Sequence, residues 1–232
     1  MQRFSGPLLL FALLLTTAAV AQNPTNQNAP PVLTTTHDQA SYAIGVSIAR
    51  DLKSNGAELN VAALLSGLRD VLTGSPQRLT DEQCDAAMTV FRRQIQQRIE
   101  AVAMKNKAEG SSFLIANQRN AGVTTLPSGL QFTVLKPGNG ATPKLNDTVV
   151  THYHGTLIDG TVFDSSVQRE EPAEFPVGGV IRGWTEALQL MKVGAKWRLF
   201  VPAELAYGPR GQGRVIGPHA VLIFDIELLG IR

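Results

Sequence analysis

The sequence contains one cysteine, Cys84, among 232 residues, and only 6% of its side chains are aromatic. A single thiol excludes an internal disulfide, so apolar cores must stabilise the fold. We expect Cys84 to be a small buried residue on an apolar helix face, with an intermolecular bridge as the alternative. The 21 basic and 19 acidic residues give a formal net charge of +2. This balance argues against a nucleic-acid partner or an acidic substrate.

Several catalytic motifs are also absent. The sequence has no G-x-S-x-G, no P-loop and no G-x-G-x-x-G at a strand-to-helix turn, which argues against a serine hydrolase elbow and a nucleotide site. His152 and His154 alternate on an expected strand, but two imidazoles are too few for a typical zinc site. Glu170 and Glu171 are a loop charge pair without the groove that glycoside hydrolysis requires. We therefore expect no metal and no cofactor.

Residues 1–21 have the pattern of an export signal. Arg3 gives a positive start, an apolar run covers residues 8–15, and small residues precede a cleavage point after Ala21. The run is too short for a comfortable membrane span, although a retained anchor is the alternative. We expect a mature chain without an integral span, located in the periplasm or outer cell envelope or secreted from the cell.

Residues 22–36 are rich in Asn, Pro and Thr and are expected to form a disordered lead-in. A helix is predicted over about 38–52, where Asp38 is a candidate N-cap. A second helix is predicted to begin at the candidate N-cap Asn60 and to stop at Gly74.

A third and longer helix is predicted to open with Thr80 and Gln83, which fit a capping box. It can reach about Asn117, with Gly110 as a weak point, because no proline interrupts residues 77–126. Its apolar residues form a narrow stripe of coiled-coil type: Cys84, Met88, Phe91, Ile95, Ile99 and Val102.

Three helices of this size make a thin core for a free-standing domain at residues 37–120. The simplest solution is a homodimer in which the helices of two copies share one core. The alternative is that the stripe packs on the C-terminal half of the same chain.

Residues 121–232 have a different pattern. One helical stretch occurs, at 182–191, and about five segments alternate like strands. These segments are GLQFTVLK, DTVVTHYHGTLI, TVFDSS, AKWRLFVP and AVLIFDIELLGI. The prediction is an α+β domain in which an antiparallel sheet wraps over one short helix.

A scatter of large apolar residues lies beside turn residues in this half. Taken alone, each of these residues is more easily explained as part of the hydrophobic core than as part of a binding site. However, residues 205–219 form a long glycine-rich loop with an aromatic residue at its root, and such loops often cover a binding site. The scattered residues are Tyr153, Phe163, Val180, Ile181, Trp184, Tyr207 and Phe224.

The segments DGTVFDSS, VIRGWTEALQLM, LAYGPRG and LIFDIELL resemble the FKBP-type peptidyl-prolyl cis-trans isomerases. The likeness covers residues 128–232. The segments SYAIGVSIARDL and LPSGLQF are similar to the N-terminal dimerisation region of the exported bacterial branch, which includes the macrophage infectivity potentiator proteins. The resemblance implies a helical dimerisation domain, a long connecting helix, an FKBP-like sheet and cofactor-free isomerisation of X–Pro bonds in exported proteins.

The resemblance also implies roles for individual residues. Trp184 would be the floor under the substrate proline ring. Val180 and Ile181 would lie at one edge, with the Ile181 N–H offered to a substrate carbonyl. Tyr207 would donate its hydroxyl to another carbonyl, and Asp164 would lie beside the amide that rotates. The remaining pocket residues would be Tyr153, Phe163 and Phe224.

Two positions depart from the pattern of the family. Ala173 stands where many members carry an aromatic residue, and Gln212 replaces a frequent histidine. We therefore expect a smaller pocket rim, which affects the binding of macrocyclic immunophilin ligands and the preference for the residue before proline. The expected partners are proline-containing polypeptides and a second copy of the chain.

The alternative function is that of a dimeric chaperone, a holdase that binds exported chains by avidity. A third possibility, a surface factor that binds proline-rich host tissue, depends on the family analogy alone.

Overall fold

A computed structural model of the chain describes residues 32–54 and 58–232. The expected export signal at 1–21 and most of the lead-in at 22–36 lie outside these residues. Within the described residues, no helix is long and apolar enough to cross a membrane.

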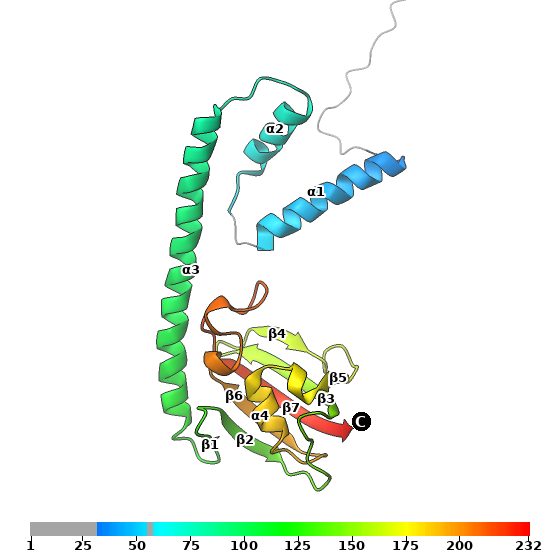
Figure 1. The fold of residues 1–232 in the computed structure, drawn as a ribbon, viewed down its shortest axis with the longest axis vertical. Coiled ribbons are helices and arrows are strands. Elements are labelled where there is room, and N and C mark those ends of the chain that lie inside the picture. The colour runs from blue at the N-terminus through cyan, green and yellow to red at the C-terminus, as the bar shows by residue number, and fades with distance from the viewer. Residues whose placement is uncertain (1–31, 55–57) are drawn as a thin grey trace, which may run out of the picture. The chain divides into compact units, whose positions relative to one another are not determined.

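The first two helices begin at capping residues. Helix α1 is Thr36–Ser54 (Figure 1). The Thr35 hydroxyl accepts a hydrogen bond from the Asp38 N–H, and the Asp38 carboxylate accepts one from the Thr35 N–H. The prediction that Asp38 is the N-cap is therefore wrong. Thr35 occupies that position, and Asp38 lies in the first turn of the helix, where it completes the pair of capping hydrogen bonds. Helix α2 is Val61–Leu72, and the side chain of its predicted N-cap, Asn60, accepts from the third helical residue at 3.1 Å.

Helix α3, Asp81–Asn117, is a continuous helix of 37 residues, about 55 Å long at the usual rise per residue. The predicted capping box is confirmed: the Gln83 N–H donates to the Thr80 hydroxyl, and the Gln83 side chain accepts from the Thr80 N–H. Gly110 does not interrupt the helix. It is buried where α3 packs against Val221.

The C-terminal half forms one antiparallel sheet of seven strands. The strands are β1 (Thr124–Thr125), β2 (Gln131–Lys136), β3 (Thr148–Leu157), β4 (Val162–Ser165), β5 (Ala173–Pro176), β6 (Lys196–Val201) and β7 (Leu222–Ile231). Their order is β1-β2-β6-β7-β3-β4, and β5 also pairs with β3. The predicted α+β architecture is confirmed. The sequence prediction missed β1 and β5, which are too short to show alternation, and β5 ends in a proline.

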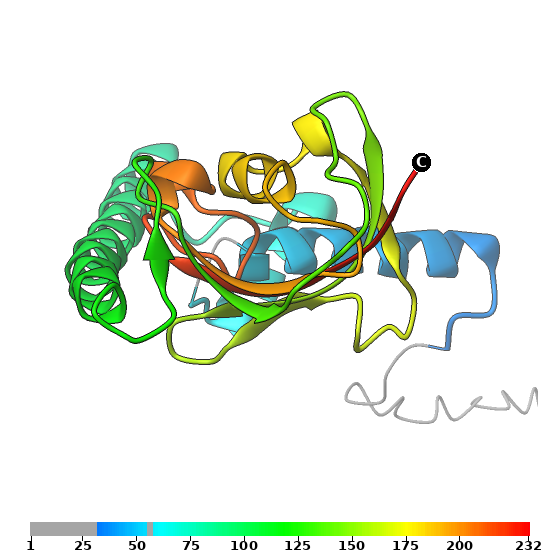
Figure 2. The same cartoon turned by 90° about the horizontal axis from the view of Figure 1, so that it is seen from below.

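The sheet curves around one short helix, α4, Arg182–Leu188 (Figure 2). Apolar side chains from α4 and from the inner face of the sheet form the core. Burial of each such side chain contributes about 1.5–3 kcal/mol. Among the fully buried residues are Leu188, Met191, Leu199, Leu222 and Ile226.

The C-terminal end of α3 is anchored to the sheet. The Asn117 side chain donates to Gln131 at 2.9 Å, and Gln131 donates to the carbonyl of Leu114 at 3.0 Å. The ring of Phe113 packs against Phe200 with centroids 5.9 Å apart. This end of α3 therefore packs on the sheet within one chain.

The stripe on the N-terminal part of α3 stays largely open to solvent in the single chain. Met88 is 47% exposed and Ile99 is 45% exposed, whereas Phe91 and Ile95 are half-buried. Cys84 is half-buried too and forms no disulfide within the described residues. Packing on the C-terminal half thus accounts for the end of α3 but not for this stripe.

The packing at Gly110 gives a test of the fold. A Cβ at Gly110 would lie 2.8 Å from Cγ2 of Val221, whereas a Cβ at Gly67 in α2 would meet nothing within 4 Å. Gly67→Ala should raise the free energy of unfolding by about 0.5–1 kcal/mol through helix propensity. Gly110→Ala should lower it by about 1 kcal/mol, because overpacking outweighs the propensity gain. Urea unfolding measures the free energy of unfolding of both variants. An equal increase in this free energy at the two positions would contradict the close contact between Gly110 and Val221.

Candidate active site

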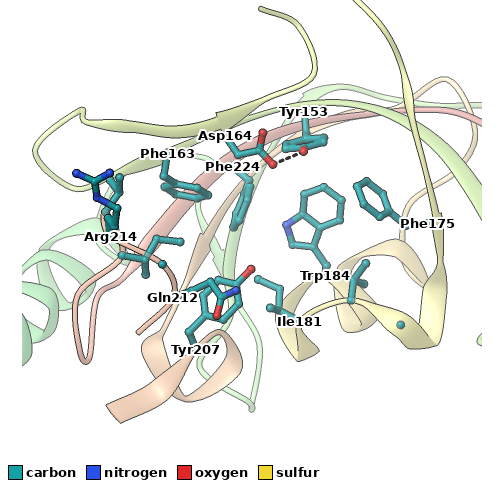
Figure 3. A pocket seen from close by; sticks show the side chains of 15 residues that line it. Tyr153, Phe163, Asp164, Phe175, Ile181, Trp184, Tyr207, Gln212, Arg214 and Phe224 are labelled. Atoms are coloured by element: carbon teal, nitrogen blue, oxygen red, sulfur yellow. Dashed lines mark hydrogen bonds between the residues drawn. The ribbon is translucent and has the colours of Figure 1, made fainter. Parts of the chain in front are cut away.

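A cavity of about 740 Å³ opens between the sheet, α4 and the loop that precedes β7 (Figure 3). The structure brings together on its walls all eight residues that the sequence predicted for the site. They are Tyr153, Phe163, Asp164, Val180, Ile181, Trp184, Tyr207 and Phe224.

Trp184 lies at the base of this cavity. It is in the first turn of α4, where its backbone N–H donates to the carbonyl of Ile181 at 2.9 Å. Three rings contact the indole nearly at right angles, those of Tyr153, Phe175 and Phe224, with centroids 5.2–5.7 Å away. Trp184 is only 4% exposed but lines the cavity. Its Nε1 is buried without a hydrogen-bond partner, although a buried indole N–H usually has one.

One wall of the cavity consists of Phe163 from β4 and Phe224 from β7. Their rings meet edge to face with centroids 5.4 Å apart. The contact depends on Gly155 of β3, because a Cβ there would lie 2.6 Å from the Phe163 ring. Aromatic pairs of this geometry are stabilised by about 0.5–1.5 kcal/mol beyond area burial. A glycine in an interior strand of the sheet therefore makes room for the wall.

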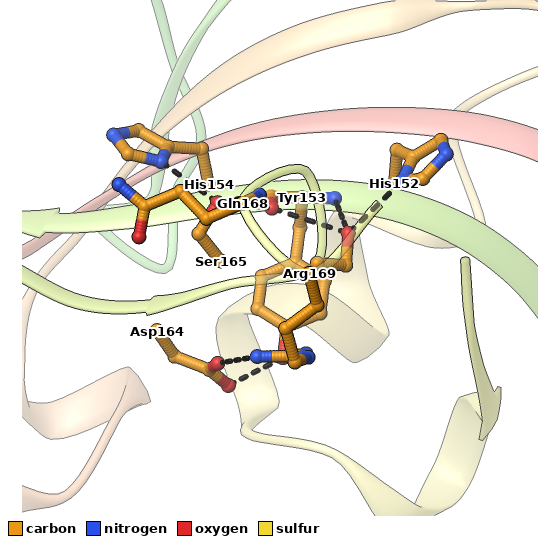
Figure 4. Close-up of polar contacts among 8 residues, drawn as sticks. His152, Tyr153, His154, Asp164, Ser165, Gln168 and Arg169 are labelled. Atoms are coloured by element: carbon orange, nitrogen blue, oxygen red, sulfur yellow. Dashed lines mark hydrogen bonds and ion pairs between the residues drawn. The ribbon is translucent and has the colours of Figure 1, made fainter. Parts of the chain in front are cut away.

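Asp164, the carboxylate that lines the cavity, is held by two donors (Figure 4). The Tyr153 hydroxyl donates to one carboxylate oxygen and the Arg169 guanidinium donates to the other. Arg169 also donates to the Tyr153 oxygen at 3.0 Å. Burial by itself raises the pKa of Asp164, but these hydrogen bonds outweigh it, so the net pKa is lowered. Asp164 is therefore an anion at neutral pH.

The two tyrosines of the cavity keep their protons. Burial raises the pKa of Tyr153, and its hydrogen bond to Asp164 raises it further. Burial also raises the pKa of Tyr207, with a smaller effect of the Asp164 charge. Both hydroxyls are therefore donors at neutral pH.

His152 and His154 lie on the face of β3 that points away from the cavity. Nδ1 of His152 is 3.2 Å from the Ser166 hydroxyl, and Nδ1 of His154 is 3.0 Å from the Ser165 hydroxyl (Figure 4). Ser166 also accepts from the Tyr153 N–H at 2.7 Å. Nowhere in the described part of the chain do three or more His, Cys, Asp or Glu side chains gather as metal ligands would.

The sequence prediction missed several lining residues, above all Phe175 and Ile216. The expectation of a smaller pocket rim at Ala173 and Gln212 stays a prediction. Ala173 packs against the core and does not line the cavity, whereas Phe175, two residues along β5 on the same face, contributes an aromatic ring to the lining. Gln212 lines the cavity as expected. No regular alternation marks β5, so only the pairing of Val149 with Phe175 reveals this position.

The sheet wrapped around α4 and the ring-lined cavity define a peptidyl-prolyl isomerase of the class that the sequence motifs predicted. Comparison with known families agrees. Residues 139–229 match the family "FKBP-type peptidyl-prolyl cis-trans isomerase". Residues 37–134 match "Domain amino terminal to FKBP-type peptidyl-prolyl isomerase".

Individual relatives cover most of the chain. It is 43% identical over 227 residues to "Outer membrane protein MIP" of Legionella longbeachae, covering 96% of this chain and 95% of the relative. It is 47% identical over 206 residues to "FKBP-type 22 kDa peptidyl-prolyl cis-trans isomerase" of Escherichia coli strain K12, covering 87% and 98%. The crystal structure of FkpA from Escherichia coli matches with a TM-score of 0.62 and 35% identity, covering 87% of this chain and 99% of that one. The chain belongs to the FKBP-type peptidyl-prolyl cis-trans isomerase family.

The charge states in the cavity predict how the activity depends on pH. No histidine lines the cavity. The lowered pKa of Asp164 keeps it ionised, and the stability from its hydrogen bonds is present above its unfolded pKa of about 3.9 and lost as the pH falls through the folded value. The raised pKa values of Tyr153 and Tyr207 keep both protonated. The rate should therefore be flat between about pH 6 and 8.

A Gln212→His variant should acquire a step near pH 6.5, the usual histidine value. Isomerisation of a proline peptide across this range measures both profiles. A step in the profile of the unsubstituted protein would contradict the expectation.

Proposed function

We propose that the cavity binds a proline ring of a polypeptide over Trp184 and lowers the barrier to rotation of the preceding amide. The observation that carries this proposal is a cavity of about 740 Å³ whose floor and walls are aromatic and whose carboxylate already accepts a hydrogen bond at each oxygen. Such a cavity suits a reaction in which no covalent bond forms or breaks.

The barrier itself explains why no nucleophile is needed. Rotation breaks amide resonance at a cost of about 18–20 kcal/mol, and uncatalysed exchange takes on the order of 10–100 s. The twisted amide has less charge on its oxygen than the planar amide, so its transfer out of water costs less. An apolar cavity therefore favours the twisted form. A reduction of the barrier by about 4–6 kcal/mol gives roughly three to four powers of ten in rate.

Three polar groups orient the peptide in this proposal. Ile181 is the N-cap of α4, so its backbone N–H takes no part in the helical hydrogen bonds and can donate to a substrate carbonyl. Tyr207 is 36% exposed, and its hydroxyl can donate to a second carbonyl. Asp164 places a fixed negative charge beside the rotating amide. Its role is electrostatic, because Tyr153 and Arg169 occupy both of its oxygens.

Two substitutions test these roles. Tyr207→Phe removes one hydrogen bond of about 0.5–1.5 kcal/mol and should lower kcat/KM by roughly three- to tenfold. Asp164→Ala should lower it by about tenfold. Isomerisation of a proline peptide and proline-limited refolding give the rates, and circular dichroism reports folding.

The matched control for Asp164→Ala is Asp225→Ala, which breaks another exposed ion pair, with Arg198, on strands β6 and β7 outside the cavity lining. It should leave kcat/KM unchanged. A loss of folded protein that accounts for the whole effect of Asp164→Ala would assign Asp164 a structural role instead.

We also propose that the chain is exported and acts as a homodimer through its N-terminal helices. The export signal in the sequence supports the first part, and one relative is called an outer membrane protein. The exposed stripe on α3 supports the second part, together with exposed apolar residues on α2, namely Leu65, Leu68 and Val71. A macrocyclic immunophilin ligand would compete with the peptide for the aromatic cavity.

Light scattering on the mature chain tests the dimer. The unsubstituted chain should have the mass of two copies. Met88→Glu combined with Ile99→Glu places charges in the stripe, so it should give a monomer, whereas Gln97→Glu on the opposite side of α3 should remain dimeric. A dimer that survives the double substitution, or a monomeric unsubstituted chain, would rule out this interface.

A holdase is the second candidate function. The exposed apolar residues of α2 favour it because they offer contact area for unfolded chains outside the cavity. Suppression of aggregation of a proline-free client by the Tyr207→Phe variant would separate holding from isomerisation.

A further inference from the structure

The loop over the cavity presents one arginine on a tightly closed tip. The backbones of Gln212 and Ile216 exchange two hydrogen bonds, of 2.8 and 3.3 Å, so residues 213–215 form a short turn between them. Ile216 is 6% exposed and belongs to the core cluster, which holds the base of the tip in place. Arg214 is exposed at the centre of this turn and lines the cavity.

Gly211 determines the backbone conformation at the base of the tip. Its φ is +66°, and a Cβ there would lie 2.2 Å from the carbonyl oxygen of Ile216. No other residue fits this conformation without moving the tip. Gly213, with a φ of +59°, provides the second left-handed residue beside Arg214. The position of Arg214 is thus set by the fold of the loop.

The charge of Arg214 is not balanced within the cavity. Asp164, the carboxylate on the lining, is engaged by Arg169 and Tyr153. No Asp or Glu occurs between Glu204 and Asp225 in the sequence. Among the described residues, no carboxylate forms an ion pair with Arg214. The loop therefore brings a positive charge without an ion-pair partner to a cleft that is lined mainly by apolar side chains.

The location of this charge indicates which part of a peptide would meet it. Arg214 lies at the end of the cavity that Phe163 forms, away from Trp184 (Figure 3). Phe163 directly precedes Asp164 in β4. With the proline ring over Trp184 and the rotating amide beside Asp164, the residue before proline extends towards this end.

We propose that Arg214 makes the cavity favour peptides with an acidic residue immediately before proline. The inference rests on the proposed function, since it needs the proline ring over Trp184. It adds a substrate class to that function: Glu–Pro and Asp–Pro bonds. The effect is modest in size because both charges are partly in water. An exposed ion pair of this kind corresponds to about a three- to fivefold change in kcat/KM, and salt reduces it.

The test compares Glu–Pro with the isosteric Gln–Pro in otherwise identical short peptides, with exchange rates measured by NMR so that no coupling protease is needed. In the full-length protein, Arg214→Gln should lower the Glu–Pro to Gln–Pro ratio of kcat/KM by about three- to fivefold. Arg214→Glu should lower it by roughly tenfold, since attraction becomes repulsion. In 1 M NaCl the variants should approach the unsubstituted protein.

Arg210→Gln is the matched control. Arg210 lies in the same loop and is exposed, but it does not line the cavity, so the substitution should leave the ratio unchanged. An unchanged ratio in Arg214→Gln, or an equal change in Arg210→Gln, would overturn the proposal. An effect of Arg214→Gln that appears only when the acidic residue follows proline would also overturn the proposal. Failure of the unsubstituted protein to accelerate a Leu–Pro peptide would instead contradict the proposed function.

Discussion

The packing of one indole against three rings is the constraint on which the site depends. Trp184 is held nearly perpendicular to Tyr153, Phe175 and Phe224, which come from three different strands. These perpendicular contacts hold the indole in place while it still lines the cavity. The same burial leaves the indole nitrogen without a partner inside the protein. An unpaired buried donor costs free energy in a folded chain, so Trp184 occupies the base of the cavity at some cost to the stability of the fold.

The second constraint concerns charge. A carboxylate in an aromatic cleft would take up a proton if burial alone acted on it. Here Tyr153 and Arg169 each donate to Asp164, so the anion persists without a substrate. In the proposed reaction, this charge is in place before the peptide binds, and no reorganisation is needed while the amide rotates. This preorganisation suits a reaction whose transition state differs from its ground state only by a twist and a small shift of charge.

Local signals in the sequence predicted the helices well, and tertiary pairing explains what they missed. The capping box of Thr80 and Gln83 acts within one turn, so its residues alone place the start of α3. Phe175 could not be found in this way, because its strand is four residues long and gains its place only by pairing with β3. Arg169 looks like any solvated loop charge in sequence, and its contacts with Asp164 and Tyr153 arise from the fold of the loop.

Helix α3 connects the exposed stripe with the loop over the cavity. The Asn106 side chain donates to the carbonyl of Pro218 at 2.7 Å, and Gly110 allows close contact with Val221, so both contacts hold the segment that leads from the loop into β7. Pro218 lies two residues after Ile216, which forms the base of the tip that carries Arg214. A helix that bends or shifts here would therefore move the wall of the cavity. The close fit at Gly110 stabilises the loop because α3 can approach it without an intervening side chain.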